Sequence, residues 1–191
     1  MAELIRSFVA IEIPETLKNQ ISEYTGNLKA RNKNIRWVRE NNLHLTLKFI
    51  GEQTPEMTDA IIARLIPINS GNSKFTLSTA DTGAFPNSRR PRVIWLGIKS
   101  EPDQALISLQ SKIEENLSPL LPDSNKKRFS PHLTLGRVKF EENFGVLFNY
   151  MNSYPFPAIA FKVNRFVLMQ SLLKPSGAQY SIIQKYPLQN T

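Results

Sequence analysis

Apolar residues follow two different periods along this chain of 191 residues. Short runs rich in Val, Ile, Leu and Phe are typical of β-strands, and between them apolar residues recur at the three- and four-residue intervals of a helix face. The pattern predicts strands at 6–13, 43–50, 74–80, 92–99, 131–138 and 161–170. It predicts helices that begin near 15, 54, 102 and 141, and a C-terminal hairpin that turns at 174–177 and returns through 179–184.

The order of these elements repeats once. The tetrapeptide His44-Leu45-Thr46-Leu47 recurs as His132-Leu133-Thr134-Leu135, and both halves of the chain read strand, helix, strand, helix, strand. We therefore predict an α+β fold in which duplicated β-α-β-α-β units form two pseudo-symmetric lobes, with antiparallel sheets around a central cleft. Residues 1–191 are expected to form a single two-lobed domain, with repeat halves at about 5–88 and 91–188.

The composition narrows the class of protein. The formal net charge of +8 favours polyanionic partners such as RNA or phosphorylated substrates. The absence of cysteine excludes disulfides and thiolate–metal sites and fits a cytoplasmic protein. Glu12 and Pro14 interrupt the first apolar run, so we expect no secretion signal and no membrane span. We also expect a monomer.

The repeated tetrapeptide places its chemistry on one face of each strand. Because side chains alternate along a strand, His44 and Thr46 share one face, and His132 and Thr134 do the same in the second copy. Packing explains the shared leucines but does not explain a polar His-Thr pair turned away from the core twice. Two imidazoles can act in sequence as base and acid near neutral pH, and the hydroxyls can bond phosphate oxygens. The pattern indicates one shared active site for displacement at phosphorus.

Other chemistries find less support. Two histidines without cysteine fall short of the three protein ligands usual at catalytic zinc, and neither motif contains a carboxylate. Ser130 and Ser171 lack a Gly-x-Ser-x-Gly context. No glycine-rich loop for a nucleoside triphosphate or dinucleotide is present. We therefore expect neither a metal nor a cofactor.

Several residues near the motifs are candidates for substrate binding. Lys48 has the parity of His44, so we expect it to face the cleft. Arg137 has the parity of the leucines, but a bulge after Gly136 would turn it inward. Phe129 is a candidate for base stacking, whereas Phe49 has the parity of the core and is expected to pack there. Phe85 is a further stacking candidate, Trp37 and Trp95 are expected in the core, and the basic tracts 88–92 and 126–128 are either RNA-steering or plain surface.

At this level of detail the chain resembles the two-histidine phosphoesterase superfamily, and within it the RNA 2′,3′-cyclic phosphodiesterases, historically called 2′-5′ RNA ligases. The resemblance rests on both His-x-Thr-x motifs and on the segments around them, which are 6–10, 42–51, 85–97, 129–138 and 175–180. It implies metal-independent opening of a terminal 2′,3′-cyclic phosphate on RNA to a 2′-phosphomonoester. It also implies that His44 donates a proton, that His132 accepts one, and that Thr46, Thr134 and Arg137 bind the phosphate.

The near-symmetric sequence does not itself decide which histidine is acid and which is base. It also leaves other functions open. The same residues would serve 2′-5′ RNA ligation in the reverse direction, or hydrolysis of 2′-5′ oligonucleotides or small cyclic phosphates. A remoter alternative is a non-catalytic RNA-binding module.

Overall fold

The structure is a computed structural model that describes residues 4–122, 128–175 and 177–190. In the first half the elements are β1 (Ile5–Glu12), α1 (Glu15–Lys29), β2 (Ile35–Trp37), the short 3₁₀ helix η1 (Glu40–Asn42), β3 (His44–Gln53), α2 (Pro55–Ser70) and β4 (Phe75–Phe85). In the second half they are β5 (Val93–Glu101), α3 (Ala105–Leu117), β6 (His132–Val138), α4 (Gly145–Ser153), β7 (Ala160–Val163), β8 (Arg165–Lys174) and β9 (Gly177–Pro187).

The strands of the described residues pair in one antiparallel sheet, in the order β7-β4-β5-β6-β3-β1-β8-β9, with β2 pairing with β6. The two motif strands, β3 and β6, are neighbours at its centre. The outer strands are exchanged between the repeats, because β4 of the first half pairs with β5 and β8 of the second half pairs with β1. Each lobe therefore combines strands from both halves of the sequence.

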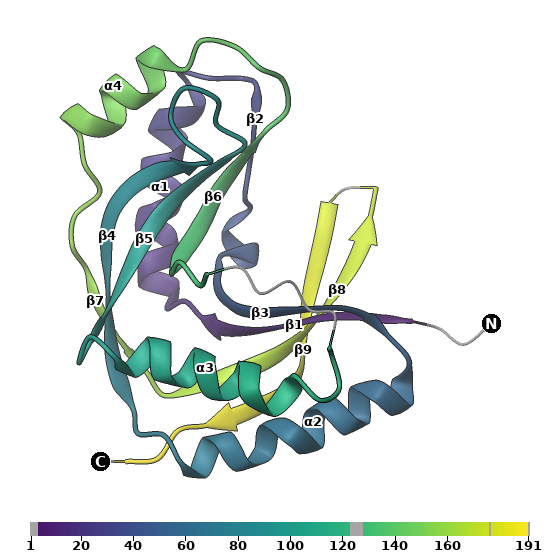
Figure 1. Ribbon diagram of the computed structural model, residues 1–191. Helices are drawn as coiled ribbons and strands as arrows, with labels where there is room; N and C mark the ends of the chain where they lie inside the picture. The colour runs from purple at the N-terminus through teal and green to yellow at the C-terminus, as the bar shows by residue number, and fades with distance from the viewer. Residues whose placement is uncertain (1–3, 123–127, 176, 191) are drawn as a thin grey trace.

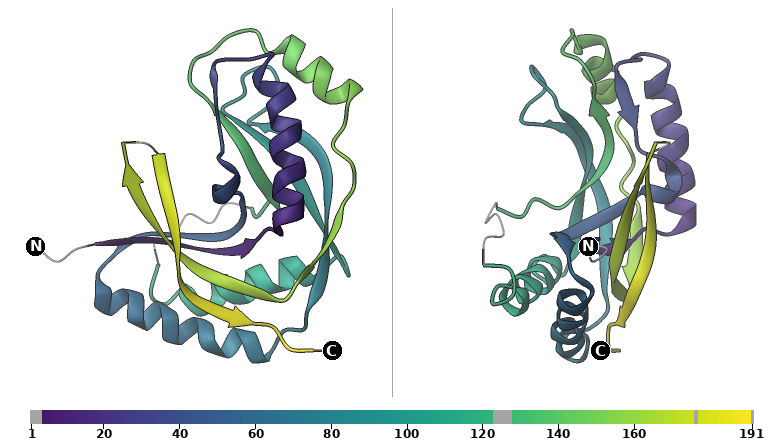
Figure 2. Two further views of the ribbon diagram at one scale, coloured as in Figure 1. Left: turned by 180° about the vertical axis from the view of Figure 1, so that it is seen from behind. Right: turned by 90° about the vertical axis from the view of Figure 1, so that its right-hand side faces the viewer.

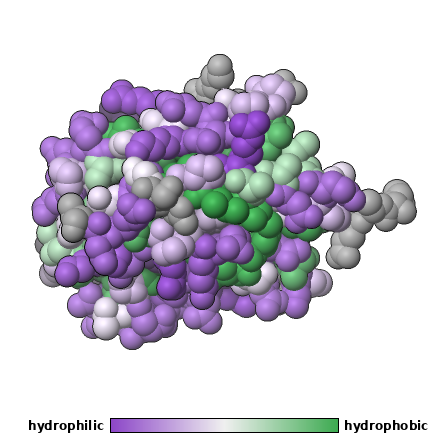
Figure 3. Space-filling view, turned by 90° about the horizontal axis from the view of Figure 1, so that it is seen from below, coloured by the Kyte–Doolittle hydropathy of each residue, from purple (hydrophilic) through white to green (hydrophobic). Residues whose placement is uncertain are grey.

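The helices cover the sheet in two pairs. Figure 1 shows α1 and α4 against the lobe built on β4, β5 and β6, and α2 and α3 below the lobe built on β1, β3, β8 and β9; the views in Figure 2 agree. The apolar stripe of α1 is buried at Leu17, Ile21 and Leu28, and that of α3 at Leu106, Leu109, Ile113 and Leu117. Figure 3 shows the outer side of α2 and α3, which is mostly hydrophilic with a strip of hydrophobic surface.

The predicted fold class is confirmed, with the sheet curled into a half-barrel. The start of α2 lies where the sequence predicts it. The Thr54 hydroxyl accepts a hydrogen bond from the Met57 N–H at 3.2 Å, and Pro55 occupies the first helical position. Other boundaries differ. β4 continues to Phe85, the predicted strand 161–170 is divided into β7 and β8, and α4 begins only at Gly145.

The two faces of the sheet carry different residues near its centre. The main core lies on the face covered by the helices and includes Leu45 and Leu133, which are both fully buried. A second, small apolar cluster of Phe8, Ala10 and Val167, with Met169 and Tyr180 packed against it, lies on the other face. We call this other face, which also carries the histidines and threonines of the two motifs, the open face.

Candidate active site

One pairing brings the two motifs together. β3 and β6 run antiparallel, and Leu45 is the register partner of Leu133. This register places His44 beside Thr134 and Thr46 beside His132 on the open face, with the two histidines on a diagonal. Diagonal neighbours in such a pair are roughly 7–8 Å apart, a span that suits a phosphate group between two imidazoles. All four polar side chains are half-buried, whereas the leucines between them are buried.

The same local contact orients both imidazole rings. Nδ1 of His44 lies 2.7 Å from the carbonyl oxygen of Asn42, and Nδ1 of His132 lies 2.7 Å from that of Ser130. A carbonyl oxygen only accepts hydrogen bonds, so Nδ1 carries the proton in each ring. In the neutral form, Nε2 then holds a lone pair, and it is the nitrogen available for proton transfer. The backbone carbonyl two residues before each histidine therefore fixes the tautomer with the proton on Nδ1.

Aromatic side chains surround both histidines. The ring of His44 lies 4.7 Å from that of Phe8 and 5.2 Å from that of Tyr180, between centroids. The ring of His132 lies 5.0 Å from that of Phe85. The sequence analysis does not identify Phe8 or Tyr180, because their contacts with His44 depend on pairing between strands that are distant in the sequence. Phe85 was a stacking candidate, and the structure places it beside the second histidine.

The environment favours the neutral form of both rings. Burial lowers the pKa of His44 to about 4, with further lowering by the positive charge of Arg137 and by His132, against a raising effect of the Asn42 hydrogen bond. The pKa of His132 is also lowered, first by burial and then by Arg137. Arg137 acts on both rings from its place on β6, three residues after Thr134. An anion bound at the site would oppose these effects and raise both pKa values.

A repeated bulge decides which side chains follow the motifs on the open face. On β3 the partners of Thr46 and Lys48 are the consecutive residues Ala10 and Val9, so Leu47 is an inserted residue. On β6 the partners of Thr134 and Gly136 are Trp95 and Ile94, so Leu135 is inserted in the same place. Each bulge reverses the alternation after the threonine.

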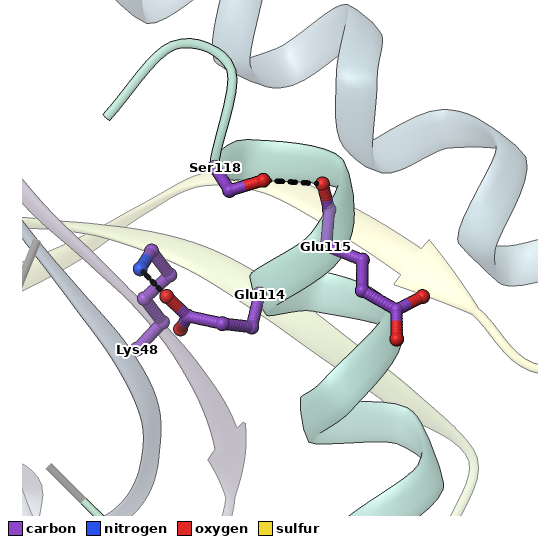
Figure 4. Close-up of polar contacts among 4 residues, drawn as sticks. All are labelled: Lys48, Glu114, Glu115 and Ser118. Carbon is purple, nitrogen blue, oxygen red and sulfur yellow. Dashed lines mark hydrogen bonds and ion pairs between the residues drawn. The ribbon is translucent and has the colours of Figure 1, made fainter. Parts of the chain in front are cut away.

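This reversal explains two differences from the sequence predictions. The prediction that Lys48 faces the histidines is wrong: its side chain is 4% exposed and forms an ion pair with Glu114 of α3, with Nζ–Oε1 at 2.7 Å. Figure 4 shows this pair beside the last turns of α3, where the Ser118 hydroxyl donates to the Glu115 carbonyl. The prediction that Phe49 packs in the core is also wrong, because it is 69% exposed.

The same reversal puts Arg137 on the open face with the histidines; the bulge that does so lies at Leu135, before Gly136 and not after it as predicted. Phe129 is half-buried and packs against the main core, and no ring contact between it and either histidine is found in the described parts of the chain. The expected basic tract at 126–128 lies outside the described residues except for Arg128, which is exposed. Trp37 and Trp95 are both partly buried. Trp37 packs against the main core as expected, whereas Trp95 is not among the residues packed there and contacts Phe85 instead.

Known proteins share this arrangement over nearly the whole chain. The model of the LigT-like phosphoesterase family matches twice, at residues 11–95 and 96–180. This chain belongs to that family. Its two matched units correspond to the two repeats, and each contains one His-x-Thr-x motif.

Individual members of the family are similar at moderate identity. The RNA 2′,3′-cyclic phosphodiesterase of Thermotoga maritima is 33% identical, over 94% of this chain and 93% of that protein. The enzyme of the same name from Methanocaldococcus jannaschii is also 33% identical, over 95% and 100%. The crystal structure of Escherichia coli LigT complexed with 3′-AMP superposes with a TM-score of 0.77 at 27% identity, and covers 98% of this chain and 100% of that one.

Two further observations concern ligands and membranes. Within residues 4–122, 128–175 and 177–190, no three His, Cys, Asp or Glu side chains are grouped as a metal site requires. In the same ranges, no helix combines the length and apolar character needed to cross a membrane.

Proposed function

We propose that this protein hydrolyses the 2′,3′-cyclic phosphate at RNA 3′ ends to a 2′-phosphomonoester, with His44 as proton donor and His132 as proton acceptor. The observation that carries the proposal is the pairing of Leu45 with Leu133, because it sets two imidazoles of defined tautomer diagonally across one face, each beside a threonine hydroxyl. The names of the relatives from Thermotoga maritima and Methanocaldococcus jannaschii support the same reaction.

The reaction needs two proton transfers. Nε2 of His132 takes a proton from water while the water oxygen forms a bond to phosphorus. The bond from phosphorus to O3′ breaks, and protonated His44 gives its Nε2 proton to O3′. The products are a 2′-phosphomonoester and a free 3′-hydroxyl, and exchange with solvent returns both rings to their starting states. The hydroxyls of Thr46 and Thr134 donate hydrogen bonds to the nonbridging oxygens, and Arg137 stabilises their negative charge.

The different burial of the two histidines supports the assignment of their roles. His44 is the more buried ring, enclosed by Phe8 and Tyr180, which suits contact with the O3′ of a bound ribose. His132 is more exposed, as a base that takes a proton from solvent water requires. A donor must be protonated, and the negative charge of the bound phosphate supplies the raised pKa that His44 lacks in the free protein.

Product analysis tests the reaction. The purified protein is incubated with EDTA and an oligoribonucleotide that ends in a 2′,3′-cyclic phosphate, and we expect a 2′-monophosphate. His44→Ala and His132→Ala should each lose at least about 10²-fold in rate. Arg64→Gln, an exposed change on α2, is the control. A 3′-monophosphate product, or full activity in both histidine variants, would contradict the proposal.

A modified leaving group tests the assignment of acid and base. In a substrate whose bridging 3′ oxygen is replaced by sulfur, the leaving group needs little protonation. This substrate should restore most of the activity lost in His44→Ala and little of that lost in His132→Ala. The opposite pattern of rescue would exchange the two roles.

A further inference from the structure

Arg36 of β2 and Arg137 of β6 are direct register partners. Their neighbours fix the face on which they lie. A Cβ atom built at Gly136 would lie 2.5 Å from Cγ2 of Ile35 and 3.1 Å from Cε3 of Trp37, so these three residues face the same way. Ile35 is buried in the main core. By alternation, Arg36 and Arg137 project from the opposite, open face, which is the face of the histidines.

This pairing places two like charges side by side. Like charges directly opposite each other in a sheet destabilise it, and Arg36 and Arg137 are both exposed. In the described ranges of the chain, neither guanidinium forms an ion pair or a side-chain hydrogen bond with a protein group. An anion between or beside them would remove the repulsion, and guanidinium groups match phosphate in shape and charge.

The two arginines differ in their distance from the catalytic centre. Arg137 lowers the pKa of both histidines, whereas Arg36 is not among the groups that affect either. Arg36 lies on the neighbouring strand, about 4.8 Å across the sheet from Arg137, along the same edge of β6 that pairs with β3 at Leu133. Beyond them, exposed Lys139 continues the row, and its backbone N–H donates to the Asn34 carbonyl. The positive charge therefore extends from the histidines over β2.

At the other end of the site, on β3, the residue equivalent to Arg137 is uncharged. The bulge after Thr46 places Phe49 at the position that Arg137 occupies after Thr134, and Phe49 is an exposed aromatic residue. The two repeats thus carry the same His and Thr side chains at the reacting group, but different side chains three residues after each threonine. At these two equivalent positions, a phosphate chain meets a guanidinium group at the β2 end and an aromatic ring at the other end.

From this arrangement we infer that Arg36 binds the phosphodiester immediately 5′ of the nucleotide that carries the cyclic phosphate. The inference rests on the proposed function and specifies its substrate class as RNA of at least two nucleotides, whose backbone leaves the site over β2. Arg137 lies between the reacting phosphate and this second phosphate. Mononucleoside 2′,3′-cyclic phosphates lack the group that Arg36 binds, so they are poorer substrates.

The test compares three substrates with the full-length protein. They are adenosine 2′,3′-cyclic phosphate, the dinucleotide ApA ending in a 2′,3′-cyclic phosphate, and the same dinucleotide with a neutral methylphosphonate as its internal linkage. We expect the protein to prefer the natural dinucleotide over the mononucleotide in kcat/KM, and Arg36→Gln to reduce that preference about 10-fold. Arg64→Gln, which removes the same charge from α2, should leave the preference unchanged.

The methylphosphonate separates Arg36 from general electrostatics. We expect the unaltered protein to lose its preference on this substrate, and Arg36→Gln to cause no further loss. The slope of log kcat/KM against log salt for the natural dinucleotide should fall by about one in Arg36→Gln. Equal preference in Arg36→Gln and Arg64→Gln, or retained preference for the methylphosphonate, would overturn the inference and leave the proposed function standing. Failure to hydrolyse any of the three substrates would overturn both.

Discussion

Leu45 and Leu133, the second residues of the two motifs, are register partners at the junction of β3 and β6. Both side chains are fully buried on the helix-covered face. The approximate symmetry of the two repeats relates one leucine to the other, so this buried pair fixes the relative position of the four polar side chains on the open face. An apolar contact thus sets the geometry of the proposed chemistry.

The pH dependence of kcat/KM should differ from that of kcat. Because the pKa of His44 is lowered to about 4 and that of His132 is also lowered, the protonated donor is scarce in the free protein at neutral pH. We expect kcat/KM to fall as pH rises, with its basic limb below about pH 6.5, the ordinary value for histidine. Bound phosphate raises the pKa of the donor, so the basic limb of kcat should lie at higher pH. Coincident limbs above pH 6.5 in full pH–rate profiles would contradict this account.

Folding stability should also respond to the lowered pKa of His44. The unfolded chain binds a proton near pH 6.5 and the folded protein only near pH 4, so the stabilising effect is complete above 6.5 and is lost as pH falls toward 4. At about 1.4 kcal/mol per pKa unit, the free energy of unfolding should decrease by on the order of 3 kcal/mol from this residue. Urea unfolding at several pH values measures it. In His44→Gln the decrease should be smaller, and an unchanged pH dependence would argue against a lowered pKa.

The ion pair between Lys48 and Glu114 should contribute to stability through the cost of breaking it. Lys48 is almost completely buried and Glu114 is about one-third exposed, with 35% of its side chain accessible. Glu114→Gln removes the negative charge opposite the buried ammonium group, and we expect a loss of about 2 kcal/mol, below the range for fully buried pairs. The double change Lys48→Met with Glu114→Gln removes the buried charge and should recover part of the loss. Equal stability of all three proteins would show that the pair is not coupled to folding.

Gly136 should be more sensitive to alanine than a helical glycine. A Cβ atom there would meet Ile35 Cγ2 at 2.5 Å, so β2 must move away from β6, and we expect Gly136→Ala to cost about 1–3 kcal/mol. The same movement displaces Arg36 from Arg137, so activity on the dinucleotide should fall with stability. Gly26→Ala in α1 is the matched control, because nothing lies within 4 Å of its Cβ, and it should stabilise by about 0.5–1 kcal/mol. Thermal melts of the two variants would be expected to shift in opposite directions.

The sequence alone predicts much of this protein because its local patterns and its chemistry agree. Alternation placed His44 and Thr46 on one face and Leu45 and Leu47 on the other, and the structure has this arrangement in both motifs. Because the tetrapeptide is repeated, the sequence predicted the same division of faces for His132 and Thr134 in the second copy. A bulge near Gly136 was predicted from the position of Arg137, and the structure has it at Leu135; the counterpart at Leu47 was missed, and with it the true faces of Lys48 and Phe49.

The elements and the chemical face of each motif were thus determined by the sequence, since period and residue type are local properties. Only the tertiary structure decided the rest. The exchange of β4 and β8 between repeats follows from pairing between distant strands, and the same hydrophobic pattern is compatible with either arrangement. The bulges arise where β3 and β6 pair with the neighbouring β1 and β5. The contacts of His44 with Phe8 and Tyr180, and the register that sets Arg36 opposite Arg137, depend on this strand pairing, which no local pattern encodes.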